Sequence, residues 1–164
     1  MSSTSKSGTV IRDATPADAE VIAEFNTQIA WETEHQQLDP AVALRGAQEG
    51  LVRPDLCRYF VAEQEGRVVG QAMVTYEWSD WHAGLCWWIQ SVFVRPECRG
   101  QGVFQSLYRH IVTLARADTS VRNLRLYVEK DNRRAMAAYE KLGMVPSGHV
   151  VYQIPPEEFK SHSC

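Results

Sequence analysis

Hydrophobic and polar positions along this chain change period several times, which predicts a mixture of helices and strands. The helical stretches show apolar residues three or four positions apart, whereas the strand-like stretches alternate or are continuously apolar. The predicted elements are, in order, a strand at 9–12, a helix from Pro16 to about Trp31, a helix from Pro40 to about Val52, strands at 58–63, 67–76 and 85–94, a helix starting at Val103, a strand at 124–128, a helix at 132–142 and an extended stretch at 145–154.

The stretch 85–94 is nearly all apolar, which is typical of a central strand covered on both faces. The two strands before it are separated by Glu65-Gly66, so we expect them to form an antiparallel hairpin. No linker or internal repeat interrupts the series. The order of elements therefore predicts an α/β (α+β) fold in one domain, residues 9–164, preceded by a disordered tip, residues 1–8.

The bulk composition narrows the functional classes. With 164 residues, 45% hydrophobic and 23% charged, the chain can bury a core as one domain. A net charge of −3 argues against nucleic acid binding, although a local basic patch at Arg95, Arg99 and Arg109 stays open. The four cysteines lack metal-site spacing, so we expect neither a disulfide framework nor a bound metal. No signal-like or membrane-spanning run is present, and we expect a soluble cytoplasmic protein.

The segment Arg99-Gly100-Gln101-Gly102 joins the central strand to the helix that starts at Val103. Such a turn directs several backbone N–H groups and a helix N-terminus at one point, which predicts an anion site, most simply for a coenzyme pyrophosphate. The segment lacks the Gly-Lys-Ser/Thr ending of a P-loop and the third glycine of a dinucleotide fingerprint. A plain strand-to-helix turn that uses glycine for positive φ is the alternative.

Asn132 and Tyr139 are seven residues apart, which is close to two helical turns, so both project from nearly one face. Asn132 is well placed as a helix N-cap, and this role does not exclude a contact with a ligand. Tyr139 is either a core tyrosine or a functional hydroxyl group. Spacing alone does not separate these two roles.

Together these segments resemble the GNAT superfamily of acyl-CoA-dependent N-acetyltransferases, over about residues 9–154. The segment Val94-x-Pro96-x-x-Arg99-Gly100-x-Gly102 resembles the family's pyrophosphate loop, and Asn132-x-x-Ala135-x-x-x-Tyr139-Glu140-Lys141-Leu142-Gly143-Met144 resembles its last-helix signature. The resemblance implies a mixed, mostly antiparallel central sheet flanked by helices and splayed between its fourth and fifth strands. It also implies acetyl-CoA (coenzyme A) as the cofactor.

The resemblance assigns roles to individual residues. Backbone groups of the central strand would bond the pantetheine arm and the thioester, and amides of the loop would hold the pyrophosphate. Tyr139 would lie by the sulfur and act as general acid for the leaving thiolate. The cofactor-binding residues implied are Val92, Phe93, Val94, Arg99, Gly100, Gln101, Gly102, Val103, Phe104, Asn132, Ala135 and Tyr139.

Three features depart from the family pattern. Phe104 stands where the loop usually has a small residue, so its side chain must point away from the diphosphate. Gln90-Ser91 replaces the acidic residues that many members carry late in the strand, so the usual base is missing there. The chain ends soon after Ile154, which leaves a sheet edge that a partner chain could complete in a homodimer.

The resemblance implies that the acceptor meets the loop at 31–39 and the loop at 77–84, which in this chain combine acids with tryptophans. This combination suits a cationic amine, whereas a solvated polar loop is the alternative. Glu34 is the assigned base, with His35, Glu77 and Glu129 as further candidates. Trp87 and Trp88 point to opposite faces, so that one can line the acceptor pocket. The expected acceptor residues are Trp31, Glu34, His35, Glu77, Trp78 and Trp88.

These observations predict an acetyl-CoA-dependent N-acetyltransferase that moves an acetyl group directly to a primary amine of a small molecule or peptide. No metal and no covalent enzyme intermediate are needed. A non-catalytic acyl-CoA-binding module is the alternative, because Gln90-Ser91 lacks the usual acids. Transfer of a longer acyl group is a further alternative.

Overall fold

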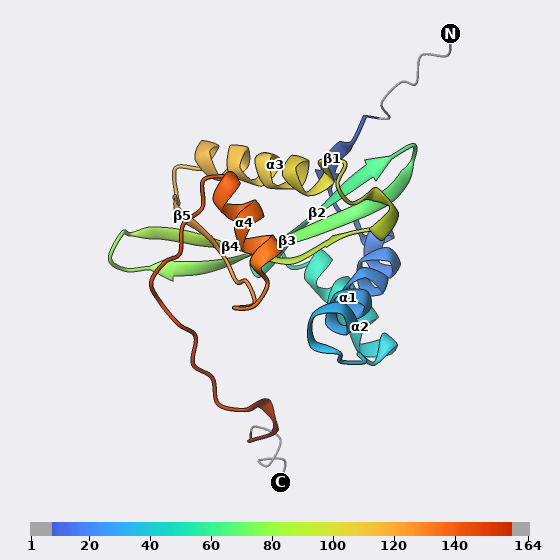
Figure 1. Ribbon diagram of the computed structural model, residues 1–164, viewed down its shortest axis with the longest axis horizontal. Helices are drawn as coiled ribbons and strands as arrows, with labels where there is room; N and C mark the ends of the chain where they lie inside the picture. The colour runs from blue at the N-terminus through green and yellow to red at the C-terminus, as the bar shows by residue number, and fades with distance from the viewer. Residues whose placement is uncertain (1–7, 159–164) are drawn as a thin grey trace. The chain divides into compact units, whose positions relative to one another are not determined.

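The computed structural model describes residues 8–158, which belong to two compact units, residues 1–127 and residues 128–164 (Figure 1). Each unit is described by itself. Apart from Gly8, the predicted disordered tip lies outside the described residues. None of the helices in the described part of the chain combines the length and the apolar character that crossing a membrane requires.

The first unit contains a five-stranded sheet in the order β1-β2-β3-β4-β5. Its strands are β1 (Val10–Asp13), β2 (Cys57–Gln64), β3 (Arg67–Ser79), β4 (Gly84–Val94) and β5 (Val121–Leu126). The first four strands pair antiparallel with their neighbours, and β5 pairs parallel to β4. The predicted mixed, mostly antiparallel sheet is therefore confirmed, as is the hairpin of β2 and β3.

Three helices cover the two faces of this sheet (Figure 1). Helix α1 (Ala19–Glu34) follows a 3₁₀ turn (Pro16–Asp18), and α2 (Pro40–Leu51) packs with it on one face. Helix α3 (Val103–Ala117) covers the other face. Apolar residues of alternating strand positions therefore contribute to two cores, as expected for a sheet buried on both sides.

The larger core lies between α3 and the sheet, and every fourth residue of the helix contributes to it. Leu107 and Ile111 are fully buried there against Phe60 and Val74. On the other face, α1 and α2 bury Ile22 and Ala47 against Tyr59 and its neighbours. The larger core includes Trp87 and Ile89 of β4, and on the other face Phe25 of α1 packs on Phe93 of β4.

Among its described residues, the second unit contains the α-helix α4 (Arg133–Lys141) and a 3₁₀ turn at residues 156–158. The side chain of Asn132 caps it, because Asn132 Oδ1 accepts the Ala135 N–H at 3.0 Å. At the other end Gly143 has φ 89°, and its N–H donates to the carbonyl of Glu140. The predicted N-cap and the predicted glycine after the helix are both confirmed.

Several predicted boundaries were wrong. Helix α1 continues to Glu34, so residues 31–34 are helical and not part of a loop. Strand β3 continues to Ser79, because Glu77 and Trp78 pair with Cys86 and Leu85 of β4. In both places polarity suggested a loop, but an exposed helix end and an exposed hairpin are equally polar.

The predicted final strand is also absent. Residues 145–154 form no strand among the described residues, and apolar side chains there are exposed, with Tyr152 at 91% and Val150 at 77%. A strand needs a hydrogen-bonded neighbour, and apolar content alone does not provide one. Pro146 and Gly148, whose φ is 79°, further interrupt an extended path.

Candidate functional site

Strand β4 carries an irregularity at Ser91. Met73 pairs with Gln90 and Gln71 with Phe93, so that one residue of β3 faces two residues of β4. Ser91 has φ 50°, a left-handed conformation that is uncommon for a residue with a side chain. This β-bulge turns the Phe93 side chain to the α1 face, where its ring lies 4.7 Å from that of Phe25.

Strands β4 and β5 separate just before this bulge. Their last paired residues are Ile89 and Leu126, and residues 90–94 have no partner on β5. The predicted splay is confirmed. Val92, Phe93 and Val94, which were expected to bind the cofactor, lie on this unpaired stretch. A strand edge without a neighbour leaves backbone groups available to a ligand.

The glycine-rich loop ends at the N-terminus of α3. Gly100 and Gly102 have φ 75° and 81°, conformations that favour glycine, and Gly102 is the N-cap. Glycine supplies no capping side chain, and the first turn of α3 holds no acidic residue. The N–H groups at this helix end therefore lack a side-chain cap and can receive an anion.

The side chain of Arg99 is already engaged. Its Nε donates to the Val94 carbonyl at 2.8 Å, and its Nη2 lies 2.9 Å and 3.0 Å from the two carboxylate oxygens of Glu32. The guanidinium also lies over the Phe93 ring. An anion in this loop would therefore meet mainly backbone donors. The predicted role of Arg99 stays a prediction.

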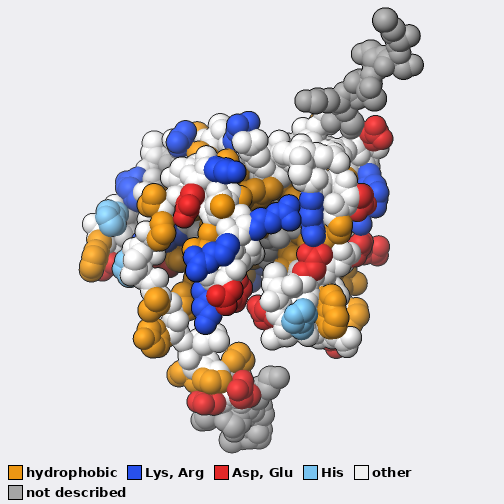
Figure 2. Space-filling model, viewed as in Figure 1, with side chains coloured by type: hydrophobic (Ala, Val, Ile, Leu, Met, Phe, Trp, Pro, Cys, Tyr) orange, Lys and Arg blue, Asp and Glu red, His pale blue; other side chains and the backbone are white. Residues whose placement is uncertain are grey.

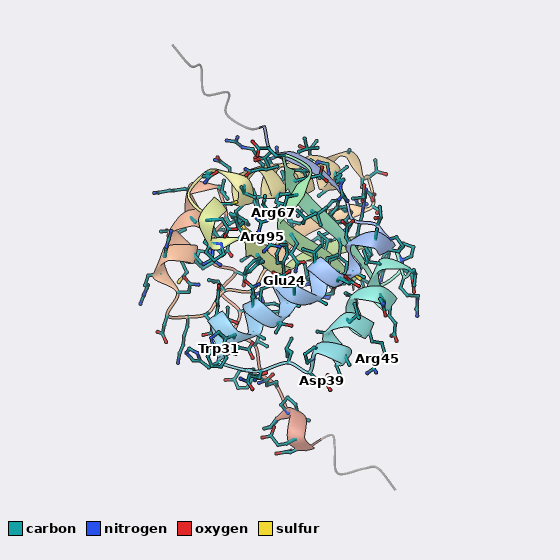
Figure 3. All side chains as sticks on the ribbon, turned by 90° about the vertical axis from the view of Figure 1, so that its right-hand side faces the viewer. Glu24, Trp31, Asp39, Arg45, Arg67 and Arg95 are labelled. Atoms are coloured by element: carbon teal, nitrogen blue, oxygen red, sulfur yellow. The ribbon has the colours of Figure 1, made fainter. Side chains whose placement is uncertain are left out.

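Arg95 also has a carboxylate partner. Its Nη1 lies 3.1 Å from Glu24 Oε1 of α1, and Figure 3 shows these side chains side by side. Arg95 Nε donates to the Val68 carbonyl. Two of the three arginines of the suspected basic patch are thus paired with acids.

Two other loop residues keep local contacts. Gln101 Nε2 donates to the Glu97 carbonyl at 3.0 Å. The Phe104 ring lies 6.1 Å from the ring of Tyr108, one turn further along α3. The bulky residue of the loop therefore packs along its own helix, and Val103 is buried in the core at 1% exposure.

Trp88 and Glu77 come together on the sheet face that carries α1 and α2. Trp88 Nε1 donates to Glu77 Oε2 at 3.0 Å, and Arg125 Nη1 lies 3.7 Å from the other carboxylate oxygen. The Tyr127 ring stacks on Trp88 at 4.4 Å with an interplanar angle of 19°. We call these four residues the Trp88 cluster. Trp87 is buried in the opposite core, as the alternation predicted.

The sequence analysis missed Arg125 and Tyr127. Both belong to the same face as Trp88, because Trp88 pairs with Arg125 across β4 and β5 and Tyr127 follows two residues later. The alternation of side chains along residues 121–127 could have indicated this shared face. It was overlooked because the predicted strand started at 124 and was therefore too short to show the alternation.

In the described part of the chain, no hydrogen bond, ion pair or ring contact joins the remaining acceptor candidates to the Trp88 cluster. Trp31, Glu34 and His35 lie at the C-terminal end of α1, where His35 has φ 52° and its ring meets Trp31 edge-on at 5.8 Å; Figure 3 shows Trp31 there. Trp78 adjoins Glu77 and therefore points to the other face of the sheet.

The hairpin of β3 and β4 ends in exposed tryptophans. Trp78 is 64% and Trp81 89% exposed. Neither side chain is therefore packed on the sheet in the way that the alternative of a solvated polar loop had assumed. Hydrophobic side chains are visible at this hairpin tip, on the left of Figure 2. Asp80 and His82 are exposed beside them.

In the second unit Tyr139 is half-buried on α4, and burial raises the pKa of its hydroxyl. Such a tyrosine stays protonated at neutral pH and can donate a proton. Asn132 Oδ1 accepts the capping hydrogen bond, and its amide N–H₂ group is left as a donor for another contact. Glu129 is exposed in the turn before α4.

The described cysteines offer no reactive group. Cys57, Cys86 and Cys98 are free and buried, and burial raises the pKa of the Cys57 and Cys86 thiols. Protonated, buried thiols are poor nucleophiles. Over residues 8–158 no group of histidine, cysteine or acidic side chains is arranged to hold a metal ion.

Comparison with known proteins places this geometry in a family. Residues 20–144 match the model of the acetyltransferase (GNAT) family. The chain is similar to a structure of a possible acetyltransferase from Clostridium difficile 630, at 40% identity and a TM-score of 0.84, covering 89% of this chain and 96% of that one.

Two curated proteins show shorter similarities. The thialysine N-epsilon-acetyltransferase of Bos taurus is 34% identical over 76 residues, which are 46% of this chain and 44% of that protein. The mycothiol acetyltransferase of Corynebacterium glutamicum is 39% identical over 85 residues, 51% of this chain and 29% of that protein. The matches span less than two thirds of the length of these relatives.

Proposed function

The chain belongs to the GNAT acetyltransferase family, and from this premise we propose that it transfers an acetyl group from acetyl-CoA to a primary amine of a small molecule or peptide. We propose the cytoplasm as its location. The observation that carries the proposal is the separation of β4 from β5 beside a helix N-terminus that no side chain caps. Both features leave backbone N–H groups open to a ligand, one at the end of β4 and the other at the start of α3, which follows it in the chain.

In this proposal the amides of residues 100–104 hold the pyrophosphate, and those of Val92, Phe93 and Val94 bond the pantetheine arm and the thioester. The amine attacks the thioester carbonyl, a C–N bond forms, and the C–S bond breaks. Negative charge develops on the carbonyl oxygen during the attack. Backbone N–H groups fixed in advance can stabilise this charge.

Two side chains complete the proton transfers. We assign Tyr139 as the acid that protonates the leaving thiolate, because its raised pKa keeps the proton available. We assign Glu34 as the base that accepts the amine proton, directly or through water. In the described part of the chain Glu34 has no ion-pair partner, whereas Glu32 and Glu77 hold arginines.

The acceptor would meet the Trp88 cluster. The stacked rings of Trp88 and Tyr127 offer an apolar surface, and the ion pair of Glu77 and Arg125 lies beside Trp88. This combination suits an amine that also carries apolar or planar groups. The name of the bovine relative, a thialysine N-epsilon-acetyltransferase, supports an amine acceptor.

The test measures free thiol released from acetyl-CoA with a panel of primary amines and short peptides. We expect release with at least one amine, and Tyr139→Phe is expected to lower kcat about 100-fold. Tyr152→Phe is the matched control, because Tyr152 is 91% exposed and outside the proposed site.

Full turnover by Tyr139→Phe at every pH would exclude Tyr139 as the acid. Tight acetyl-CoA binding without thiol release from any amine would favour the second candidate, a non-catalytic acyl-CoA-binding module. The observation behind that candidate is Gln90, which stands near the bulge as a neutral amide and donates to Thr75 Oγ1 at 2.6 Å.

A further inference from the structure

Gln71 is a buried glutamine on β3, directly beside the bulge of β4. Its side chain is completely buried, and its Nε2 donates to Ser91 O at 3.1 Å and to Asn26 Oδ1 at 2.8 Å. Its Oε1 is also buried and has no hydrogen-bond partner among the described residues. One side chain thus connects helix α1 with the bulge.

The orientation of this amide follows from its partners. The Ser91 carbonyl can only accept, so the amide nitrogen of Gln71 must face it. Asn26 consequently turns its oxygen to Gln71. Asn26, Gln71 and Ser91 O are therefore joined by two hydrogen bonds.

The buried Oε1 of Gln71 has no partner in the described part of the chain, which lowers stability, whereas its two N–H donors satisfy Ser91 O and Asn26 Oδ1. A methionine of similar volume would remove both the unsatisfied carbonyl and the two donors. What glutamine adds is the pair of N–H donors. The donor to Ser91 O holds a residue in the left-handed region, a conformation that persists only when its surroundings enforce it.

Holding this carbonyl also orients the next amide. The described chain has no cis peptide bond, and in a trans peptide the C=O and the N–H point in opposite directions. With Ser91 O directed at Gln71, the Val92 N–H points away from Gln71. The same bulge sets the register of Phe93 and Val94.

We propose that Gln71 is a positioning residue for acetyl transfer: by holding the Ser91 carbonyl, it presets the backbone N–H groups of Val92 and Val94, which point away from β3, for the thioester oxygen. The inference rests on the proposed function. Donors that are fixed before the reaction stabilise the developing charge, whereas loosened donors must first reorganise. Loss of the Gln71 donors therefore slows the acyl transfer more than it weakens binding of acetyl-CoA.

The first experiment compares Gln71→Met with Gln64→Met in the full chain. Gln64 is a strand glutamine of β2 that donates to Thr9 Oγ1 at 2.9 Å, away from the bulge. Gln71→Met is expected to lower kcat about 10- to 100-fold and to change the KM for acetyl-CoA less than about 3-fold. Gln64→Met is expected to keep both values. An unchanged kcat in folded Gln71→Met would overturn the proposal.

The second experiment needs no acceptor. In ¹⁵N-labelled protein, the amide resonances of residues 92–94 are compared with acetyl-CoA and with CoA, which lacks the thioester oxygen. An acetyl-specific shift is expected in the wild type and should be lost in Gln71→Met. The shifts that CoA alone causes at residues 100–104 should persist. Absence of the acetyl-specific shift in the wild type, or its persistence in Gln71→Met, would contradict the inference.

The two proposals can fail separately. If no amine releases thiol but the acetyl-specific shift depends on Gln71, the proposed transfer fails and the positioning role holds. If Gln71→Met does not fold, Gln71→Leu takes its place, because this smaller apolar side chain also lacks the donor to Ser91 O. It should weaken the acetyl-specific shift in the same way, and an unchanged shift would refute the role.

Discussion

Gly70 of β3 lies where β4 and the start of α3 come closest, so Gly70→Ala perturbs both at once. An added Cβ would lie 2.9 Å from the Phe93 carbonyl oxygen and 3.2 Å from Val103 Cγ1. Neither neighbour can move freely. Phe93 packs on Phe25, and Val103 is buried at 1% exposure as the first residue of α3. The methyl group must therefore displace β4 after the bulge or the helix end beside the glycine-rich loop.

The expected loss follows from these contacts. Overpacking of a closed core costs about 1–3 kcal/mol. Replacing glycine by alanine offsets about 0.4–1 kcal/mol of this loss, because it lowers the conformational entropy of the unfolded chain. We expect Gly70→Ala to lower the free energy of unfolding by roughly 0.5–2.5 kcal/mol, which lowers Tm by about 1–10 °C in a chain of this size. The affinity for acetyl-CoA should fall as well, because the loop is anchored at Val103.

Urea unfolding gives the stability, and isothermal titration gives the affinity for acetyl-CoA. Gly46→Ala is the control, because Gly46 lies within α2 with nothing within 4 Å of an added Cβ. That change should stabilise the protein by about 0.5–1 kcal/mol. The reasoning fails if Gly70→Ala is as stable as the wild type and binds acetyl-CoA equally well.

Three further predictions concern other parts of the first unit. A hydrogen bond from Arg12 lowers the pKa of the Asp18 carboxyl, so Asp18→Ala should lower the free energy of unfolding by about 1–3 kcal/mol at pH 7. In urea titrations this difference from the wild type should shrink as the pH falls below about 4 and through the pKa of Asp18 in the folded protein. A difference independent of pH would contradict the prediction. Gly102→Ala places a side chain at φ 81° and should cost about 1–2 kcal/mol and raise the KM for acetyl-CoA, whereas unchanged stability and KM would show that the loop tolerates it. Burial raises the pKa of the Cys57 and Cys86 thiols, so iodoacetamide followed by peptide mapping should label them only after unfolding, and rapid labelling of the native protein would refute this.

The parts of the fold that could be predicted are those with a local signal. The helical spacing of Leu107 and Ile111 and the glycines of the loop each specify a few neighbouring residues, and α3 and its turn lie where they were expected. Boundaries at Glu34 and Ser79 were wrong because exposed helix ends and exposed strands are as polar as loops. Residues 145–154 have strand-like composition, but a strand depends on a partner that composition does not reveal.

The site contains contacts that no local pattern encodes. Arg99 pairs with Glu32 across 67 positions, and Gln71 reaches Asn26 across 45. Each becomes visible only when α1 is placed against β4, because any arginine could pair with many acids in the sequence. The Trp88–Glu77 bond depends likewise on the register of β3 and β4.

Helix α1 supports β4 where β5 no longer does. After Ile89 the strand has β3 on one side, whereas no strand of the described residues pairs with it on the other, and an open edge of this kind is normally mobile. Contacts from α1 reach this stretch and the segment after it: Phe25 with Phe93 at 4.7 Å, Glu24 with Arg95 at 3.1 Å, Glu32 with Arg99 at 2.9 Å, and Asn26 through Gln71. These contacts use side chains, so they restrain the strand without occupying its backbone donors. A strand that is both open and rigid is what a preorganised backbone site requires, and for this reason we expect changes along this face of α1 to affect kcat before they affect folding.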